Sequence, residues 1–421
     1  MTDSTPFERR AVFSLASLYA FRMLGLFMVL PVLSLYGDEY TGSTPFLLGL
    51  ALGVYGFSQA LLQIPFGMLS DRFGRKPVIA GGMLLFAIGS VIAATADSVE
   101  GLILGRFLQG SGAIASAIMA LVSDLTADEN RTKAMALIGM SIGASFALAL
   151  VLGPLITSIA GISGIFWLTA CLAVIGIIIL YKVVPTSRIL PRTRRDAGTV
   201  PGMLRSTLAN PELLRLDFGI FVLHLILMAS FIVLPHVLEG QLGVHREQHW
   251  RVYLPLLGLS FIAMVPFIIL AEAKRKMKPV FVGAIILLAL SELALLFWQH
   301  DLVLTLGAMF LFFMAFNLLE ACLPSLVSKI APAGNKGTAS GIYSSSQFFG
   351  AFCGGIMGGW LIESYDASTV FVVCACLLVL WALVASLMHP PAHLTSLLLS
   401  MTSEQLALLG PKLRDLPGVA E

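Results

Sequence analysis

Long apolar stretches alternate with short polar breaks along almost the whole chain. Each stretch is about 19–27 residues long, which at about 1.5 Å per residue lets a helix cross the hydrocarbon core of a bilayer. The stretches lack the strict alternation of barrel strands, so we predict helices. The pattern indicates an all-α integral membrane protein with twelve spans. These spans are expected at 11–36, 46–70, 78–96, 100–123, 133–158, 164–184, 216–238, 250–271, 279–299, 302–328, 338–362 and 368–388.

The composition agrees with a membrane protein. The chain is 57% apolar and 12% charged, whereas soluble domains carry about a quarter charged residues. Its net charge of +2 is too small to indicate a nucleic-acid partner. The five cysteines lie in apolar stretches, so we interpret them as packing residues rather than disulfides or metal ligands. The sequence HREQH at 245–249 lacks the H-E-x-x-H order of a zinc site, and we expect no metal ion and no cofactor.

The distribution of basic residues predicts the orientation of the chain. If the N-terminus is cytoplasmic, almost all Lys and Arg outside the spans lie on the cytoplasmic side, and Arg246 and Arg251 lie opposite. Cytoplasmic loops are enriched in Lys and Arg. We therefore expect a multi-pass protein of the inner (cytoplasmic) membrane with both termini in the cytoplasm.

The longest polar connection divides the predicted spans six and six. We expect an N-terminal bundle at 1–184, a cytoplasmic linker at 185–215, a C-terminal bundle at 216–388 and a cytoplasmic tail at 389–421. The two bundles also share a sequence pattern, because PFGMLSDRFGRKPV (65–78) has a counterpart in PFIILAEAKRKMKPV (266–280). Two repeated six-helix halves are typical of secondary transporters with a binding site between the halves.

Three motifs carry a resemblance to a known family. The first follows the second predicted span, the second lies in the fourth, and the third lies in the fifth. Their residues are Gly67, Asp71, Arg72, Gly74, Arg75 and Lys76; Arg106, Gln109 and Gly110; and Gly139, Gly143, Gly153 and Pro154. They resemble motifs A, B and C of the major facilitator superfamily, and together they are similar to its twelve-helix drug:proton antiporters. The stretch RMLGLFMVLPVL (22–33) is most similar to the YajR-type efflux transporters.

The resemblance implies that the first motif is a gate. Asp71 would lie at the N-terminus of the eleventh helix, near Lys336, where a carboxylate is stabilised by the helix dipole. Arg75 would pair with Asp71 and with Asp124. Such a latch would hold the two halves together on the cytoplasmic side and open during transport. The alternative is a basic loop that only sets topology, but it leaves Asp71 and the two glycines of the motif unexplained.

Ionisable residues inside predicted spans are candidates for proton coupling, because a charge in the membrane interior is costly. The resemblance associates Arg106 with this role. The N-terminal half has no carboxylate in the interior of its spans. We therefore place the proton carrier in the other half, with Glu320 as the first choice and Glu292 and His224 as alternatives, each of which could instead be structural.

The substrate cavity is expected to contain polar residues that share a helix face. Tyr55, Gln59 and Gln63 follow a four-residue spacing on one span. The other candidates are Arg22, Asn317 and Gln347. Small residues at Gly139 and Gly143 in the fifth span, and at 350, 354 and 358 in the eleventh, predict that these two helices slide at the interface between the halves.

The sequence thus favours a transporter that exports amphipathic small molecules in exchange for protons by alternating access. We expect a monomer in contact with membrane lipid, and no enzyme activity, since no catalytic constellation is present. Two alternatives stay open: transport of an anionic metabolite, which Arg22 and Arg106 would favour, and a transporter-like membrane sensor. The tail after Pro391 could begin a truncated small α/β domain, as the resemblance implies, or it could be a disordered tail or an interfacial helix.

Overall fold

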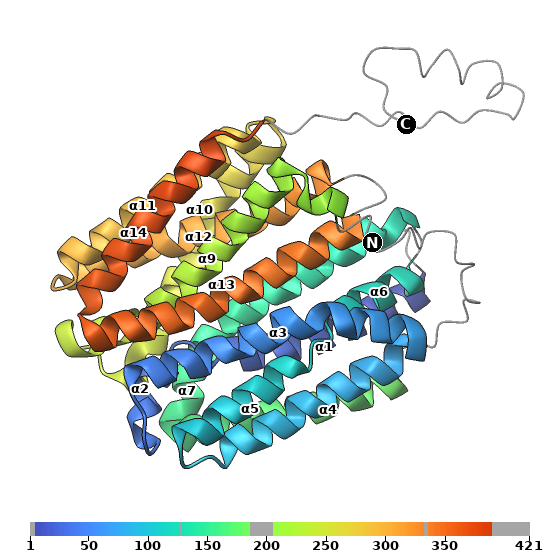
Figure 1. Ribbon diagram of the computed structural model, residues 1–421, viewed down its shortest axis with the longest axis horizontal. Coiled ribbons are helices and arrows are strands. Elements are labelled where there is room, and N and C mark those ends of the chain that lie inside the picture. The colour runs from blue at the N-terminus through green and yellow to red at the C-terminus, as the bar shows by residue number, and fades with distance from the viewer. Residues whose placement is uncertain (1–4, 127, 186–204, 332–335, 390–421) are drawn as a thin grey trace, which may run out of the picture. The chain divides into compact units, whose positions relative to one another are not determined.

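The structure is a computed structural model that describes residues 5–126, 128–185, 205–331 and 336–389. Within these ranges it is helical, and its one β-bridge joins Thr41 to Ser98. Figure 1 shows the long helices packed along a common direction. The helices are α1 Pro6–Phe27, α2 Leu33–Tyr36, α3 Pro45–Phe73, α4 Arg75–Ala94, α5 Val99–Ser111, α6 Ala115–Leu125, α7 Asp128–Lys182, α9 Pro211–His236, α10 His249–Glu272, α11 Met277–Trp298, α12 Leu302–Ile330, α13 Lys336–Ser364 and α14 Ala367–Ser386, with short 3-10 or π turns η1 Gly37–Glu39, η2 Val237–Gln241 and η3 Arg246–Gln248.

The all-α membrane fold is confirmed, but the count of spans is less simple than predicted. Ten helical stretches of the described chain are long and apolar enough to cross a membrane. One of them, 133–182, covers the predicted fifth and sixth spans, because α7 continues through a break at Gly161, whose φ is 65°. The 29-residue helix α13, which corresponds to the predicted eleventh span, is not among the ten.

Two spans that were predicted as continuous helices are interrupted in the structure. The first was expected to run from 11 to 36, but α1 ends at Phe27 and a series of turns leads to α2. Pro31 lies in this connection, and proline cannot donate the hydrogen bond that a continuing helix needs. The fourth was expected at 100–123, but it is divided into α5 and α6 at Gly112, Ala113 and Ile114.

Several helices begin where a short polar side chain caps the backbone. Thr44 accepts a hydrogen bond from Leu47 N at the start of α3, and Ser98 accepts one from Gly101 N at the start of α5. Asp301 and Asp366 do the same for α12 and α14. These caps satisfy N–H groups that have no partner inside the helix, so they fix where each helix leaves its loop.

The two halves, α1–α7 and α9–α14, belong to one compact unit, and glycines join them. Along α3 and α13 the backbones touch, since a Cβ added at Gly49 would lie 2.2 Å from Gly355 O, and one at Gly56 would lie 2.4 Å from Phe348 O. The predicted sliding of the fifth helix on the eleventh is therefore wrong. Helix α13 packs on α3 and α9, and α7 packs on α10.

The glycines behind that wrong prediction have other neighbours. An added Cβ at Gly350 or Gly354 would meet the backbone of α9, at Phe221 O and Leu225 O. At Gly139 and Gly143 an added Cβ would meet no atom within 4 Å among the described residues. At Gly350 and Gly354 the small-residue pattern correctly indicated a close neighbouring helix but not which one. At Gly139 and Gly143 it indicated a neighbour that the described residues do not provide.

Candidate functional site

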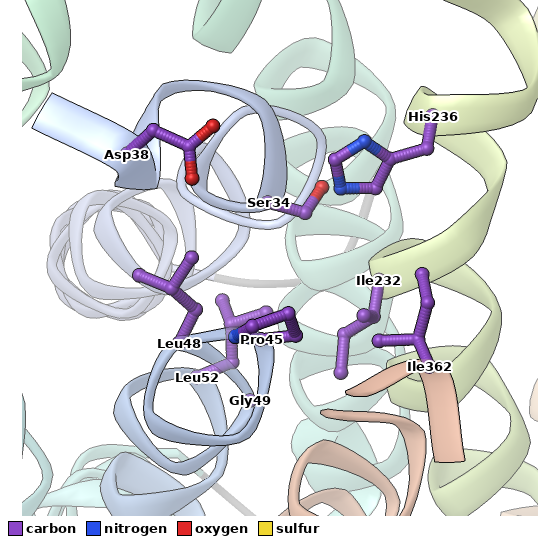
Figure 2. A pocket seen from close by; sticks show the side chains of 9 residues that line it. All are labelled: Ser34, Asp38, Pro45, Leu48, Gly49, Leu52, Ile232, His236 and Ile362. Atoms are coloured by element: carbon purple, nitrogen blue, oxygen red, sulfur yellow. The ribbon is translucent and has the colours of Figure 1, made fainter. Parts of the chain in front are cut away.

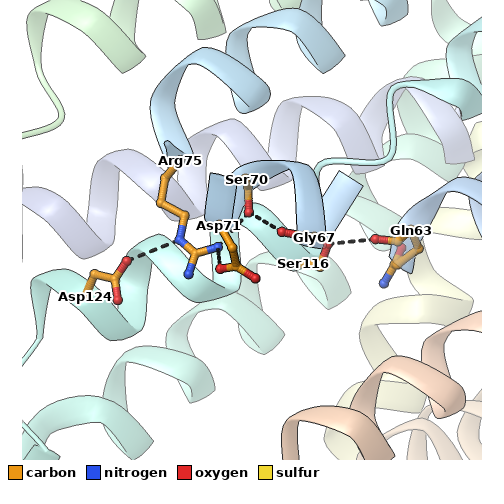
Figure 3. Close-up of polar contacts among 7 residues, drawn as sticks. All are labelled: Gln63, Gly67, Ser70, Asp71, Arg75, Ser116 and Asp124. Atoms are coloured by element: carbon orange, nitrogen blue, oxygen red, sulfur yellow. Dashed lines mark hydrogen bonds and ion pairs between the residues drawn. The ribbon is translucent and has the colours of Figure 1, made fainter. Parts of the chain in front are cut away.

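The first motif forms a compact set of polar contacts around Arg75 (Figure 3). Its Nη1 lies 2.5 Å from Asp71 Oδ1 and donates to Ser70 Oγ at 2.6 Å, and its Nε lies 3.3 Å from Asp124 Oδ2. Both ion pairs expected of Arg75 are therefore present. Ser70, which donates onward to Gly67 O at 2.7 Å, is a member that the sequence did not single out, because serines are frequent inside these helices.

Glycine makes this arrangement possible. Gly74 separates α3 from α4 with a φ of 94°, a conformation that glycine adopts at little cost and other residues rarely adopt. The turn places Arg75 at the start of α4, within reach of the last turn of α3. Lys76 donates to Val184 O at 2.7 Å, and the Arg72 guanidinium lies 5.5 Å from the Phe73 ring centre. We call the end of the molecule that carries Gly74 and Arg75, which is predicted to be cytoplasmic, the inner end. The opposite end is the outer end.

The expected contact between Asp71 and the eleventh helix is not formed in this conformation. The Asp71 side chain is 65% exposed, and its ion pair is with Arg75. Within the described ranges, an added Cβ at Gly337 or Gly341 in the first turns of α13 would meet nothing within 4 Å. The inner ends of α3 and α13 are thus apart.

A second polar network is buried inside the N-terminal half. Arg22 of α1 donates to Gln59 Oε1, and Gln59 Nε2 donates to Gln63 Oε1 at 2.6 Å. The Arg22 guanidinium also lies 5.8 Å from the Tyr55 ring centre. The predicted polar face of α3 is confirmed as a shared face, but Arg22, Tyr55 and Gln59 are fully buried against other helices rather than lining an open cavity.

Arg106 approaches the same tyrosine from α5. Its guanidinium lies 4.9 Å from the Tyr55 ring centre. It donates to Gln109 Oε1 at 2.9 Å and to Ala51 O at 3.3 Å, and Gln109 donates on to Ser90 Oγ at 2.8 Å. Gly110 lets α5 reach α3 closely, because an added Cβ would lie 2.2 Å from Tyr55 O.

The two arginines lack full compensation in the part of the chain that the structure describes. Arg22 Nε and Nη1 and Arg106 Nη2 are buried without a hydrogen-bond partner, as is the Tyr55 hydroxyl. Both guanidinium groups pair with neutral amides and carbonyls rather than with carboxylates. A buried charge without a counter-ion is costly, so this region carries uncompensated positive charge.

The C-terminal half brings three predicted residues together from three helices. His224 of α9 and Gln347 of α13 approach to 2.8 Å between their Nε2 atoms, and Gln347 Nε2 donates to Glu320 Oε1 at 3.3 Å. His224 Nε2 lies 4.0 Å from Glu320 Oε2. The Glu320 side chain is 33% exposed, whereas that of His224 is 9% exposed. The Glu320 Oε2 atom is itself buried and has no hydrogen-bond partner among the described residues. This cluster therefore contains, inside a span, a carboxyl group whose hydrogen bonding is incomplete.

The other two candidates of this half lie apart from the cluster. Glu292 of α11 is fully buried and accepts a hydrogen bond from Ser230 Oγ at 2.9 Å. Asn317 of α12 donates to Ser260 Oγ at 3.2 Å. Each is held by a neighbouring hydroxyl group, as a structural polar residue in a helix bundle would be.

The comparisons with known proteins identify the family of this chain. The family model of the Major Facilitator Superfamily matches residues 15–352 and 218–412. The chain is 52% identical over 398 residues to the inner membrane transport protein YajR of Escherichia coli (strain K12), covering 93% of this chain and 86% of that protein. The chain belongs to the major facilitator superfamily.

More distant relatives and solved structures point the same way. The multidrug resistance protein MdtH of Aeromonas hydrophila is 26% identical over 349 residues, which is 80% of this chain and 84% of that protein. The structure of a bacterial homologue of the human lysosomal transporter Spinster superposes with a TM-score of 0.73 at 15% identity, over 91% of this chain and 97% of that one. The latter likeness shows the fold alone. The major facilitator superfamily consists of transporters that act on small molecules.

The third motif of this family member contacts the irregular segment after α1. An added Cβ at Gly153 would lie 2.4 Å from Met28 O and 3.2 Å from Pro31 Cγ. Pro154 follows within α7. Gly153 therefore lets α7 approach the turns that replace the end of the predicted first span. The third motif thus packs against the point where that span is interrupted.

An aromatic cluster lies between the halves. The sequence suggested Phe316 as apolar surface of the binding cavity, but it did not single out Phe146. The Phe146 ring of α7 lies 5.1 Å from Phe27 in its own half, and 5.8 Å from Phe316 and 6.5 Å from Phe231 in the other half. Phe316 lies 6.0 Å from the His224 ring. With 27 phenylalanines in the chain, composition alone could not identify Phe146 as the residue that bridges the halves.

At the outer end a cavity of about 140 Å³ lies between the halves. Figure 2 shows Ser34 and Asp38 on one side and His236 on the other. Apolar side chains complete the wall, namely Pro45, Leu48, Leu52, Ile232 and Ile362, together with Gly49. The cavity lies beside the contact of α3 with α13, so it belongs to the closed outer end rather than to the polar clusters deeper in the helices.

Proposed function

We propose that this transporter exports amphipathic small molecules in exchange for protons by alternating access. The observation that supports this most is the cluster of His224, Glu320 and Gln347, which places a carboxyl group with one unpartnered oxygen beside an imidazole within a membrane span. An ionisable group at such depth marks an ion pathway in many transporters. The names of its relatives, an inner membrane transport protein and a multidrug resistance protein, are consistent with this role.

Glu320 suits a proton carrier better than Glu292. A carrier must take up and release a proton on each transport cycle, so its carboxyl group needs a route to water. The Glu320 side chain is partly exposed although its Oε2 atom is buried, and it has a neighbouring imidazole and amide that can accept or donate hydrogen bonds in either protonation state. Glu292 is fully buried and bonded to Ser230.

The aromatic cluster beside His224 supports an amphipathic substrate. Phe316 is a member of the aromatic cluster and lies next to the His224 ring. Phe146 extends the aromatic surface across to the N-terminal half. Aromatic rings offer a large apolar surface to a substrate, and they attract a cationic group through their faces. A substrate that contacts this surface would lie within a few ångströms of the proton-binding cluster.

Asp71, Arg75 and Asp124 are the proposed gate at the inner end. In this conformation Arg75 joins the two carboxylates, and Asp71 is largely exposed. When the inner end closes, Asp71 would move to the N-terminus of α13. Partly buried pairs of this kind can form and break during a cycle, because desolvation offsets much of the attraction between the charges.

The experiment that tests this proposal measures flux in proteoliposomes with an imposed pH gradient. Ethidium serves as the model amphipathic cation. We expect the wild-type protein to accumulate ethidium inside vesicles whose interior is more acidic than the medium, because the exit of protons drives the entry of ethidium, and we expect Glu320→Gln to abolish this gradient-driven flux. Glu292→Gln is the matched control, since it neutralises a carboxylate of the same half. Wild-type flux that ignores the pH gradient, or gradient-driven flux that persists in Glu320→Gln, would contradict the proposal.

A second candidate is the transport of an anionic compound, and one observation favours it. Arg22 and Arg106, whose guanidinium groups both lie near the Tyr55 ring, present buried nitrogen atoms without partners among the described residues. An organic anion that reached this region would supply the missing counter-charge. A solved structure of the human organic anion transporter MFSD10 also superposes on this chain with a TM-score of 0.67 at 21% identity.

A further inference from the structure

Helices α3 and α13 form an antiparallel pair that connects the two halves. Residue numbers rise along α3 while those of the contacting residues fall along α13. The contacts are Gly49 with Gly355, Gly53 with Phe352 and Gly56 with Phe348. Among the described residues, the last polar contact between the two helices toward the inner end joins Ser345 Oγ to Ala60 O at 3.4 Å. Beyond it the helices separate, as Figure 1 shows for the ends of α3 and α13 on the side of α6. This conformation is closed at the outer end and open at the inner end.

At the outer end a carboxylate of one helix binds the N-terminus of the other. Glu363, one residue before the end of α13, accepts a hydrogen bond from Phe46 N at 2.7 Å. Phe46 lies in the first turn of α3, where backbone N–H groups have no partner within the helix. Pro45 has no N–H, and Leu47 N is satisfied by the Thr44 hydroxyl. Glu363 therefore accepts the hydrogen bond of Phe46 N, which has no acceptor within its own helix. This bond crosses the boundary between the halves.

A second polar contact closes the same end. Arg246, which precedes α10, donates to Leu35 O of α2 at 2.9 Å, and its guanidinium lies 4.9 Å from the Tyr36 ring centre. Glu239 holds Arg246 in place at 2.7 Å. Because Leu35 and Tyr36 belong to the N-terminal half and Arg246 to the other, the outer end is joined at two separate points.

We propose that Glu363 is an outer latch, the reciprocal of the inner latch proposed for Asp71. Asp71 lies two residues before the end of α3, and Glu363 one residue before the end of α13. Each carboxylate can cap the N-terminus of the partner helix, but α3 and α13 touch at one end while they diverge at the other. The two caps therefore alternate: Glu363 binds α3 when the outer end is closed, and Asp71 binds α13 when the inner end is closed.

This inference rests on the alternating-access part of the proposed function, and not on its substrate or coupling ion. Its energetic basis is the attraction of a carboxylate to a helix N-terminus, which changes a two-state population by about two- to fivefold at an exposed site. Such a cap can bias the conformational equilibrium without preventing the opposite state, as a reversible latch requires.

Distance measurements between spin labels test the proposal. Labels on Thr95→Cys and Gln241→Cys, in a variant whose five native cysteines are replaced, report the separation of the two halves at the outer end. We expect Glu363→Ala to lower the ratio of short to long distances by about two- to fivefold. Asp71→Ala should raise that ratio by a similar factor, and the double variant should return it close to the parent value. Glu100→Ala, an exposed carboxylate in the first turn of α5, is the matched control and should change nothing.

The proposal is overturned if Glu363→Ala leaves the distance ratio of the parent unchanged, or shifts it in the same direction as Asp71→Ala. Since the measurement needs neither substrate nor a pH gradient, it can fail or succeed independently of proton-coupled transport. If flux does not depend on the pH gradient but the distances shift as expected, proton coupling is rejected. The proposal that Glu363 is an outer latch is then still supported.

Discussion

At the scale of single residues, the unusual feature is positive charge without a counter-ion. Arg22 and Arg106 are fully buried, and both guanidinium groups lie near the Tyr55 ring. Their contacts with amides, carbonyls and an aromatic ring compensate part of the desolvation, but three guanidinium nitrogen atoms have no partner among the described residues. Residues that cost stability in this way are retained at functional sites more often than in structural cores.

Replacing one of these arginines should separate stability from function. Arg22→Met keeps most of the side-chain volume and removes the buried charge, so we expect the protein to become more stable by roughly 1–4 kcal/mol. Thermal unfolding in detergent measures this as a raised Tm. If Arg22 binds an anionic substrate, the same variant should lose transport of organic anions and retain ethidium flux.

The opposite result would assign Arg22 a structural role. A Tm that falls by an amount typical of a core truncation would mean that its hydrogen bond to Gln59 and its contact with Tyr55 hold α1 to α3. Gln63→Ala tests the same network from its far end, where Gln63 accepts from Gln59 and carries no charge.

At the scale of helices, close backbone contact between α3 and α13 controls the outer end. The sequence predicted the long helices and their approximate bounds from apolar runs, and it predicted the contacts of Arg75 through a family motif. Its small-residue pattern did not identify the backbone contact of α3 with α13, because a small residue shows only that some neighbour is close. It also missed the breaks after Phe27 and at Gly112, where tertiary contacts rather than hydropathy decide the path of the chain.

A substitution within this helix pair tests the contact. An added methyl group at Gly49 would lie 2.2 Å from Gly355 O, so Gly49→Ala should push the outer ends apart. We expect a cost of about 1–3 kcal/mol to the outer-closed state, seen as increased labelling of an engineered cysteine at Ser34 by a membrane-impermeant maleimide. Gly341→Ala is the control, because an added methyl group there meets nothing within 4 Å. Equal labelling in the two variants would contradict the close contact.

At the scale of the whole molecule, the features fall into layers along the helices. The gate around Arg75 lies at the inner end, the polar and aromatic clusters lie inside the helices, and the contacts of Glu363 and Arg246 lie at the outer end. A transporter that works by alternating access needs a reversible closure on each side of a central site, and this order of features would provide them. The predicted tail domain and most of the linker, at 390–421 and 186–204, lie outside the described residues.

The most direct test of the central claim is a measurement of proton movement driven by substrate. Proteoliposomes that contain the protein and a sealed pH-sensitive dye are loaded with ethidium and diluted into ethidium-free buffer, with no pH gradient imposed. We expect ethidium efflux to acidify the vesicle interior, because each exported molecule exchanges for protons, and we expect no acidification in vesicles without protein. Protein-dependent ethidium efflux with no change in internal pH would contradict the account.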